Sequence, residues 1–126
     1  MKTVKWIVHI LLAVAFLGFG TMKLITPYAD MLVEPAMAWA GEFSEMQVKI
    51  IGSLEILGAL GLLLPVLLKK QKMFVPFAAL ALGGIMIGAM MTHIGRDEPI
   101  IINIVILLLA LLTFWWRKDW MKKEAA

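Results

Sequence analysis

The 126-residue chain contains no cysteine, and only 17% of its residues are charged. The absence of cysteine excludes disulfide frameworks, thiol relays, iron–sulfur clusters and thiolate metal sites. Hydrophobic residues make up 62% of the chain, whereas a soluble domain is about half apolar and about a quarter charged. Such an apolar composition also excludes disorder. We therefore expect a membrane protein rather than a soluble domain.

Sequence motifs that mark common catalytic or cofactor sites are also missing. The chain has no Walker loop, no glycine-rich dinucleotide motif, no H-E-x-x-H and no nucleophile elbow. No basic cluster is interleaved with aromatic residues, as a nucleic-acid surface would require. We predict no nucleic-acid partner and no metal site. The sequence leaves open whether the protein is an enzyme and assigns no catalytic residue.

Four apolar runs are present, and a membrane-spanning helix takes about 20 residues. We predict helices at about 4–24, 48–68, 73–94 and 99–116, within a single membrane domain over residues 1–126. The fourth run is only just long enough. The second and third connections are short turns, which favour antiparallel neighbours. The sequence thus predicts an all-α fold, an antiparallel bundle of four transmembrane helices.

The first apolar run is predicted to be a retained helix rather than a cleaved signal peptide. Small-x-small sites occur at 36–38 and 38–40, well past that run, whereas signal cleavage follows the apolar segment closely. The connection at 25–47 is the only one with room for its own structure. We expect a short interfacial helix there.

Basic residues predict the orientation of the bundle. Nine lie at the end that holds both termini and the 69–72 turn, and three lie at the opposite end. The nine are Lys2, Lys5, Lys69, Lys70, Lys72, Arg117, Lys118, Lys122 and Lys123. Because positive charge accumulates on the cytoplasmic side, both termini are predicted to be cytoplasmic, in a bacterial plasma (inner) membrane. We name the end with the termini the inner end and the opposite end the outer end.

Helical periodicity assigns an inward face to each helix. Each face includes the helix's polar residue, and three of the four include glycine, which lets helices approach closely in lipid. The faces comprise His9, Leu12, Phe16, Phe19, Gly20 and Lys23; Gly52, Glu55, Ala59 and Leu62; Ala79, Gly83, Met86, Met90 and His93; and Asn103, Leu107, Ala110 and Phe114. His9 is expected to lie alone near the inner end.

The other polar residues of these faces gather in the outer half. Glu55 lies about 12 Å below the outer end of its helix, where a carboxylate needs a partner, a proton or water. Lys23 and His93 are the available partners. The carboxylate fits either a proton-handling or ligand-binding site or a structural ion pair. The predicted ligand-binding residues are Lys23, Glu55, His93, Asn103, Trp39 and Arg96.

A G-x-x-x-G pattern lies on the opposite face of the third helix. It is formed by Gly84 and Gly88, outside the stripe that we assign to the interior. Small residues at this spacing pack against another helix or a second protomer. We therefore predict a homo-oligomer through this face.

Four segments resemble the DoxX-like family of small four-helix integral membrane proteins. They are F-L-G-F-G-T-M-K-L at 16–24, W-A-G-E-F at 39–43, G-S-L-E-I-L-G-A-L-G-L-L-L-P at 52–65, and H-I-G-R-D-E at 93–98 with Asn103 beyond it. The resemblance covers nearly the whole chain and implies a four-helix membrane fold. The family takes its name from a subunit associated with thiosulfate–quinone oxidoreductase chemistry. The family pattern touches Lys23, Glu42, Glu55, His93, Arg96 and Asn103 without assigning them roles.

Three functions are consistent with the residues and with this resemblance. The first is a quinone- or small apolar ligand-binding subunit, associated with partner subunits of a membrane oxidoreductase system; without cysteine, a thiol relay is excluded. The second is a non-enzymatic membrane assembly or interaction module. The third is a small proton-coupled transporter, which ranks below the first because a carboxylate paired with lysine is a poor shared site for a proton and a drug.

Overall fold

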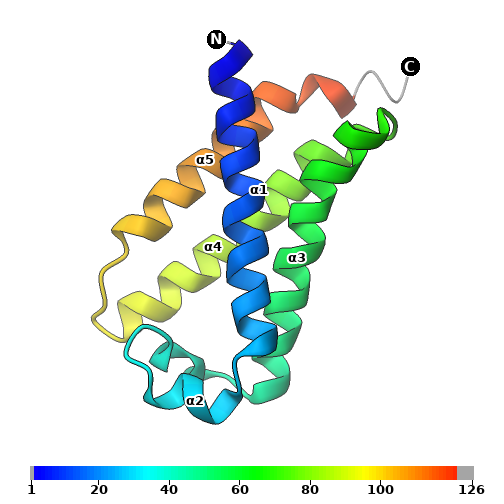
Figure 1. Cartoon of the computed structure of the whole chain (residues 1–126). Coiled ribbons are helices and arrows are strands. Elements are labelled where there is room, and N and C mark those ends of the chain that lie inside the picture. The colour runs from blue at the N-terminus through cyan, green and yellow to red at the C-terminus, as the bar shows by residue number, and fades with distance from the viewer. Residues whose placement is uncertain (1, 122–126) are drawn as a thin grey trace.

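The computed structural model describes residues 2–121, and all regular secondary structure in that range is helical. Its elements are α1 (Lys2–Ile25), α2 (Tyr28–Val33), the 3-10 helix η1 (Ala38–Glu42), α3 (Glu45–Leu68), α4 (Phe74–Gly95) and α5 (Ile101–Arg117). Figure 1 shows the four longer helices packed together, with α2 and η1 beneath one end. The N-terminus, the α3–α4 turn and the end of α5 lie at the other end. The all-α prediction is confirmed.

The four longer helices differ in their ability to cross a bilayer. The helices α1, α3 and α4 contain 24, 24 and 22 residues and are each long and apolar enough to span a membrane. The helix α5 is also apolar but has only 17 residues. At about 1.5 Å per residue it extends about 26 Å, slightly less than a hydrocarbon core of about 30 Å. Residues 2–121 therefore contain three helices of spanning length and a fourth that is marginally shorter.

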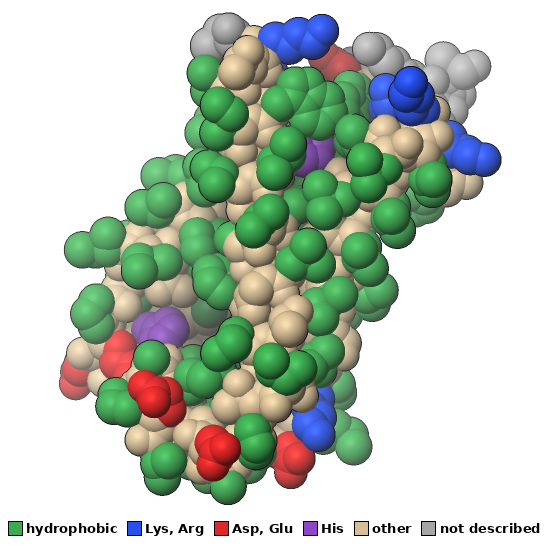
Figure 2. All heavy atoms as spheres, viewed as in Figure 1, with side chains coloured by type: hydrophobic (Ala, Val, Ile, Leu, Met, Phe, Trp, Pro, Cys, Tyr) green, Lys and Arg blue, Asp and Glu red, His purple; other side chains and the backbone are tan. Residues whose placement is uncertain are grey.

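The outward side chains match a lipid environment. Figure 2 shows hydrophobic side chains over the middle of the molecule, with most Asp and Glu gathered at the lower, outer end and most Lys and Arg at the upper, inner end. Many large apolar residues are more than one-third exposed, among them Ile7, Leu57, Leu67 and Ile102. A soluble protein rarely exposes so much contiguous apolar surface. The composition and the surface therefore both indicate a membrane protein.

The starts of α3 and α5 differ from the predicted bounds for local reasons. The helix α3 begins at Glu45, three residues early, because Ser44 and Gln47 form a capping box. The Ser44 hydroxyl accepts from the Gln47 amide at 3.1 Å, and the Gln47 side chain accepts from the Ser44 amide at 2.9 Å. The helix α5 begins at Ile101, two residues late, because Pro99 and Ile100 remain non-helical.

The 25–47 connection has its own structure, as the sequence indicates, but forms two short helices rather than one. Met31 of α2, Ala40 of η1 and Val48 of α3 are buried together. The Tyr28 hydroxyl donates a hydrogen bond to the carbonyl of Phe43, which ties the start of α2 to the end of η1. This connection therefore packs as a cap against the outer end of the helices.

The buried faces of α1 and α3 follow the predicted stripes, whereas that of α5 follows its stripe only in part. Ala110 is buried as predicted, and Leu107 and Phe114 are half-buried and pack against the same core. The most buried residues of α5 also include Ile106, Thr113 and Arg117, which the stripe omits. The buried face is therefore shifted around the helix toward Arg117, which has buried partners at the inner end.

A close crossing of α1 and α3 determines the geometry of the outer half. A Cβ atom on Gly20 would lie 2.5 Å from the carbonyl oxygen of Gly52, and one on Gly52 would lie 2.9 Å from that of Gly20. Only hydrogen fits at either position. The crossing therefore brings the backbones of the two helices into contact, and Lys23 and Glu55 lie one turn away from it.

Candidate functional site

A buried ion pair joins α1 to α3 in the outer half. The Lys23 ammonium lies 2.8 Å from Glu55 Oε1, and the two side chains are 13% and 3% exposed. The same ammonium lies 3.5 Å from the carbonyl oxygen of Phe19, one turn earlier in α1. A helical side chain that points toward the N-terminus of its own helix reaches this position. Lys23 therefore folds back into the bundle instead of extending to the outer surface.

Two aromatic rings lie beside this ion pair, and that of Trp39 belongs to the outer cap. The Lys23 ammonium lies 5.2 Å from the ring centroid of Trp39 and 5.7 Å from that of Phe19. The Trp39 ring in turn packs edge-on against Phe43, at the end of the outer cap. Aromatic faces attract cations through their quadrupole, most strongly for tryptophan. The Trp39 ring thus packs over the Lys23 ammonium, and the helix η1 holds Trp39 in this position.

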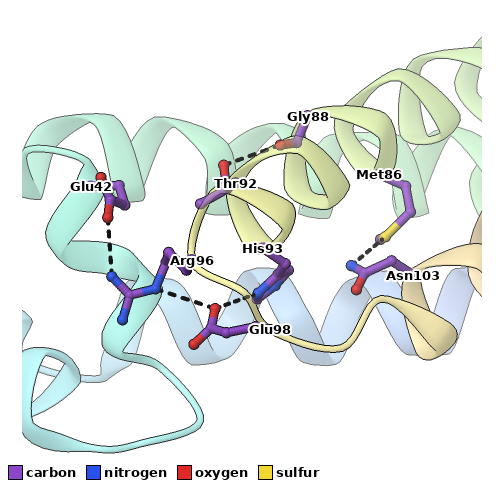
Figure 3. A network of polar contacts seen from close by, with 8 residues as sticks. All are labelled: Glu42, Met86, Gly88, Thr92, His93, Arg96, Glu98 and Asn103. Atoms are coloured by element: carbon purple, nitrogen blue, oxygen red, sulfur yellow. Dashed lines mark hydrogen bonds and ion pairs between the residues drawn. The ribbon is translucent and has the colours of Figure 1, made fainter.

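A second group of charged residues lies on the turn between α4 and α5 (Figure 3). His93 Nδ1 donates to Glu98 Oε1 at 2.8 Å, and Arg96 Nε donates to the same oxygen at 3.2 Å. Arg96 also reaches Glu42 at the end of η1, at 3.1 Å. The hydrogen bond with His93 lowers the pKa of Glu98 below its ordinary value, and the charge of Arg96 lowers it further. This network joins the α4–α5 turn to the outer cap.

A third polar contact lies deeper, between α4 and α5. The Asn103 side-chain amide donates to the thioether sulfur of Met86 at 3.1 Å (Figure 3). A thioether is a weak hydrogen-bond acceptor. Met86 and His93 are seven residues apart, so they lie on one face of α4 at about 10 Å along the helix. Asn103 and His93 are both half-buried.

The six predicted ligand-binding residues thus fall into three groups. Lys23 and Glu55 are paired under Trp39; His93 and Arg96 share Glu98; and Asn103 contacts Met86. Of the two partners considered for Glu55, Lys23 contacts it, whereas His93 contacts Glu98 instead. The sequence alone does not separate these groups, because they depend on how the α4–α5 turn folds.

Sequence reasoning missed a polar cluster at the inner end. His9 Nε2 donates to the carbonyl oxygen of Leu62 at 2.7 Å, and Arg117 Nε donates to His9 Nδ1 at 3.2 Å. The Arg117 guanidinium lies 4.4 Å from the ring centroid of Trp6 and 4.6 Å from that of Trp120. His9 is therefore not alone, and Arg117 is buried rather than being a surface charge of the inner end. The inner-end cluster, defined as these five residues, joins α1, α3 and α5.

Two buried polar atoms in this region have no hydrogen-bond partner within the described part of the chain. They are the hydroxyl oxygen of Thr113 and Nη2 of Arg117. Thr113 and Arg117 are four residues apart and share the buried face of α5 with Ala110. That spacing could have indicated a shared buried face. The sequence favours an interfacial charge at Arg117 instead, because Arg117 follows two tryptophans at the end of an apolar run.

The G-x-x-x-G face of α4 is open. A Cβ atom added to Gly84 or Gly88 would meet nothing within 4 Å. Both glycines therefore point away from the helices of this chain, and the homo-oligomer remains a prediction. Among residues 2–121, no group of three His, Asp or Glu side chains is placed to hold a metal ion.

Comparison with known proteins gives one positive result. The model of the DoxX-like family matches residues 7–115, which include α3, α4, most of α1 and α5, and every residue of the three outer groups. No curated protein and no solved structure matches the chain. This match confirms the family that the four short sequence segments indicate. The chain belongs to the DoxX-like family.

Proposed function

We propose that this DoxX-like membrane protein binds a quinone, or a similar small apolar ligand with carbonyl groups, in the outer half of its helical bundle. It would do so as a subunit of a membrane oxidoreductase system. In this proposal the helices run antiparallel across a bacterial inner membrane, with both termini in the cytoplasm. The ligand partitions into the bilayer and enters from the lipid, so a bundle without a soluble domain suffices.

The contact between Asn103 and Met86 carries the proposal. The Asn103 amide donates to a thioether at 3.1 Å, and a thioether is only a weak hydrogen-bond acceptor. A ligand carbonyl would be a better acceptor for the same N–H group. The side chain is half-buried between α4 and α5, whose neighbouring residues are mostly apolar, so a ligand that enters from lipid could reach it. A small apolar ring with a carbonyl group matches these surroundings.

His93 supplies a second polar group on the same face of α4. Its Nδ1 is held by Glu98, and this fixes the ring so that Nε2 lies on the side away from the carboxylate. A second carbonyl of the ligand would accept from this nitrogen when it carries a proton. The network of Glu98, Arg96 and Glu42 keeps the histidine in place from the outer side.

The Lys23–Glu55 pair is proposed to position the site rather than to bind the ligand. It holds α1 against α3 beside the Gly20–Gly52 crossing, with both side chains largely buried. A carboxylate that is already paired cannot serve as a proton site that a transported cation also occupies. The pairing therefore counts against a proton-coupled transporter.

Ligand titration tests the proposal directly. Protein in nanodiscs is titrated with short-tailed ubiquinone and menaquinone analogues, and binding is followed by quenching of tryptophan fluorescence. We expect saturable binding to the wild type and at least tenfold weaker binding to Asn103→Leu and His93→Ala. Thr92→Ala is the matched control, because the Thr92 hydroxyl donates to the Gly88 carbonyl of its own helix at 3.1 Å.

Two results would contradict the proposal. One is the absence of saturable binding to a wild-type protein with a cooperative thermal transition. The other is equal binding by Asn103→Leu and the wild type. In either case the non-enzymatic assembly module would become the better account of the outer polar groups.

The proposed orientation has a test that uses the lack of cysteine. A single cysteine at the exposed Thr3 or at the exposed Asp30 is the only thiol in the chain. In intact cells, a membrane-impermeant maleimide should label Asp30→Cys and leave Thr3→Cys unlabelled until lysis. The reverse pattern would place the termini outside.

Association with an oxidoreductase is tested by purification under gentle conditions. Affinity-tagged protein is extracted from its native membrane, cross-linked and analysed by mass spectrometry. We expect subunits of a quinone-linked oxidoreductase among the cross-linked partners. Recovery of this chain alone, with extraction shown to be complete, would contradict the association.

A further inference from the structure

An apolar groove runs along the lipid-facing side of α3 and α4. It consists of two adjoining hollows of about 540 and 500 Å³. Leu57, Gly61 and Phe74 line both hollows, so they form one continuous groove. It lies on the opposite side of these helices from the polar groups of the bundle interior, none of which lines it.

The groove has the length of one lipid chain. Along α3 it extends from Leu54 to Leu68, which is about 21 Å at 1.5 Å per residue. One leaflet accounts for half of a hydrocarbon core of about 30 Å. The groove is therefore longer than one leaflet is deep. An acyl chain that enters at the inner end can lie in the groove along its whole length.

Glycines form the floor of the groove. A Cβ atom on Gly61 would lie 3.0 Å from Cβ of Ala78, and one on Gly58 would lie 2.5 Å from a methyl carbon of Leu82. Side chains at these two positions would therefore push α3 and α4 apart or fill the space between them. Because Gly58 and Gly61 have no side chains, backbone and small side chains line the floor of the groove. Leu57 and Phe74 form its walls.

The inner end of the groove is polar and basic. Lys70 and Gln71 of the α3–α4 turn line the inner hollow together with apolar residues of both helices. The turn is well defined, because the Lys70 amide donates to the Pro65 carbonyl at 3.2 Å and Lys69 and Gln71 adopt positive φ angles of 58° and 56°. Lys70 and Gln71 thus lie at the mouth of an apolar groove, on a turn with a defined backbone.

We propose that this groove binds an anionic phospholipid, with one acyl chain between α3 and α4 and the phosphate at Lys70 and Gln71. The charge of the mouth favours this occupant. A second copy related by a two-fold axis along the membrane normal would bring two lysine-rich turns together, and like charges repel. A quinone has no negative charge to offer Lys70, whereas basic pockets at the ends of membrane helices bind anionic headgroups.

The experiment uses native mass spectrometry of the full chain. Protein is reconstituted in vesicles of equal parts phosphatidylglycerol and phosphatidylethanolamine, released into detergent, and examined for bound lipid. We expect the wild type to retain one phosphatidylglycerol in preference to phosphatidylethanolamine. One lysine near a membrane surface contributes a factor of about five in binding, so Lys70→Gln should reduce this preference about fivefold.

Two further variants separate the groove from general surface charge. Lys69→Gln removes the same charge one residue away, from a side chain that does not line the groove, and should leave the preference unchanged. Ala81 is exposed and lines the outer hollow, so Ala81→Phe fills the groove without disturbing the buried core and should abolish retention of both lipids.

Several results would overturn the proposal: equal retention of the two lipids, equal losses in Lys69→Gln and Lys70→Gln, unchanged lipid in Ala81→Phe, or a lipid-free dimer that Ala81→Phe dissociates. Asn103→Leu should retain the lipid normally. Failure of the quinone proposal and failure of this one are therefore distinguishable in the same spectra.

Discussion

The two ends of the bundle hold a buried cation in different ways. At the outer end, Lys23 faces the carboxylate of Glu55 at 2.8 Å. At the inner end, the guanidinium of Arg117 lies between the rings of Trp6 and Trp120 and donates to the neutral imidazole of His9. No carboxylate within residues 2–121 forms an ion pair with Arg117. One end is stabilised by opposite charge and the other by aromatic faces and a neutral acceptor.

This difference has consequences for stability. A buried ion pair is strongly destabilised when one partner is lost, because the other charge remains buried. A cation that is held by aromatic rings and one imidazole depends on several weaker contacts. Replacing that cation leaves no buried carboxylate without a partner. The outer half is therefore expected to depend strongly on one ion pair between α1 and α3, whereas the inner end depends on several weaker contacts.

The largest expected effect comes from breaking the outer ion pair. Lys23→Met leaves the Glu55 carboxylate without its only polar contact among the described residues and should lower the free energy of unfolding by about 3–5 kcal/mol. The double variant Lys23→Met/Glu55→Leu should recover most of that loss. Unfolding in detergent by added denaturing surfactant measures both. Equal stability of Lys23→Met and the wild type would mean that the pair does not hold α1 to α3.

The second effect tests the crossing that brings the pair together. Gly20→Ala places a methyl group 2.5 Å from the Gly52 carbonyl oxygen, so the helices must separate, at a cost of about 3 kcal/mol. Gly18→Ala is the matched control in the same helix, since a methyl there meets nothing within 4 Å. The control should be neutral or slightly stabilising because alanine favours helix. Similar thermal midpoints for the two variants would refute a close crossing.

The third effect compares the inner end directly with the outer end. Arg117→Met removes the donor to His9 but leaves no opposite charge behind, so the loss should be about 1–2 kcal/mol, smaller than for Lys23→Met. The same unfolding assay measures it, and ring packing should survive in the near-ultraviolet circular dichroism of the tryptophans. A loss larger than that of Lys23→Met would reverse the comparison between the two ends.

The smallest effect concerns pH at the outer rim. The pKa of Glu98 is lowered in the folded protein, first by the hydrogen bond with His93 and then by Arg96, so its contribution to stability is present above the ordinary value of 4.5. It is lost as pH falls through the lowered value. The Tm of the wild type should therefore drop more between pH 6 and pH 3 than that of Glu98→Gln. Parallel curves would show that this network does not stabilise the turn.

Much of this architecture could be predicted from the sequence. The four apolar runs indicate the helices, and the 3.6-residue period places Glu55 and Gly52 on one buried face, as found. A partner for Glu55 follows from the rarity of a carboxylate in hydrocarbon, and Lys23 is one of the two candidates. These features depend on local sequence pattern and on the high free energy of a charge in hydrocarbon. Both can be assessed from a single sequence.

The remainder depends on geometry that a local pattern does not record. His93 turns to Glu98 because the 96–100 segment folds back, and Asp97 has a positive φ of 57° there. Arg117 is buried because Trp6 and Trp120, 114 positions apart, converge on it from separate segments. Contacts of that kind appear only once the helices are placed, so the α5 face and the inner-end cluster could not be predicted.

Native mass spectrometry of protein released from its own membrane is the decisive test of ligand binding in the outer half. We expect a bound species with the mass of a quinone on the wild type. That species should be lost from Asn103→Leu, in the outer half, and retained by Arg117→Met, at the inner end. A spectrum without such a species, or one in which Arg117→Met loses it and Asn103→Leu keeps it, would contradict the assignment of ligand binding to the outer half.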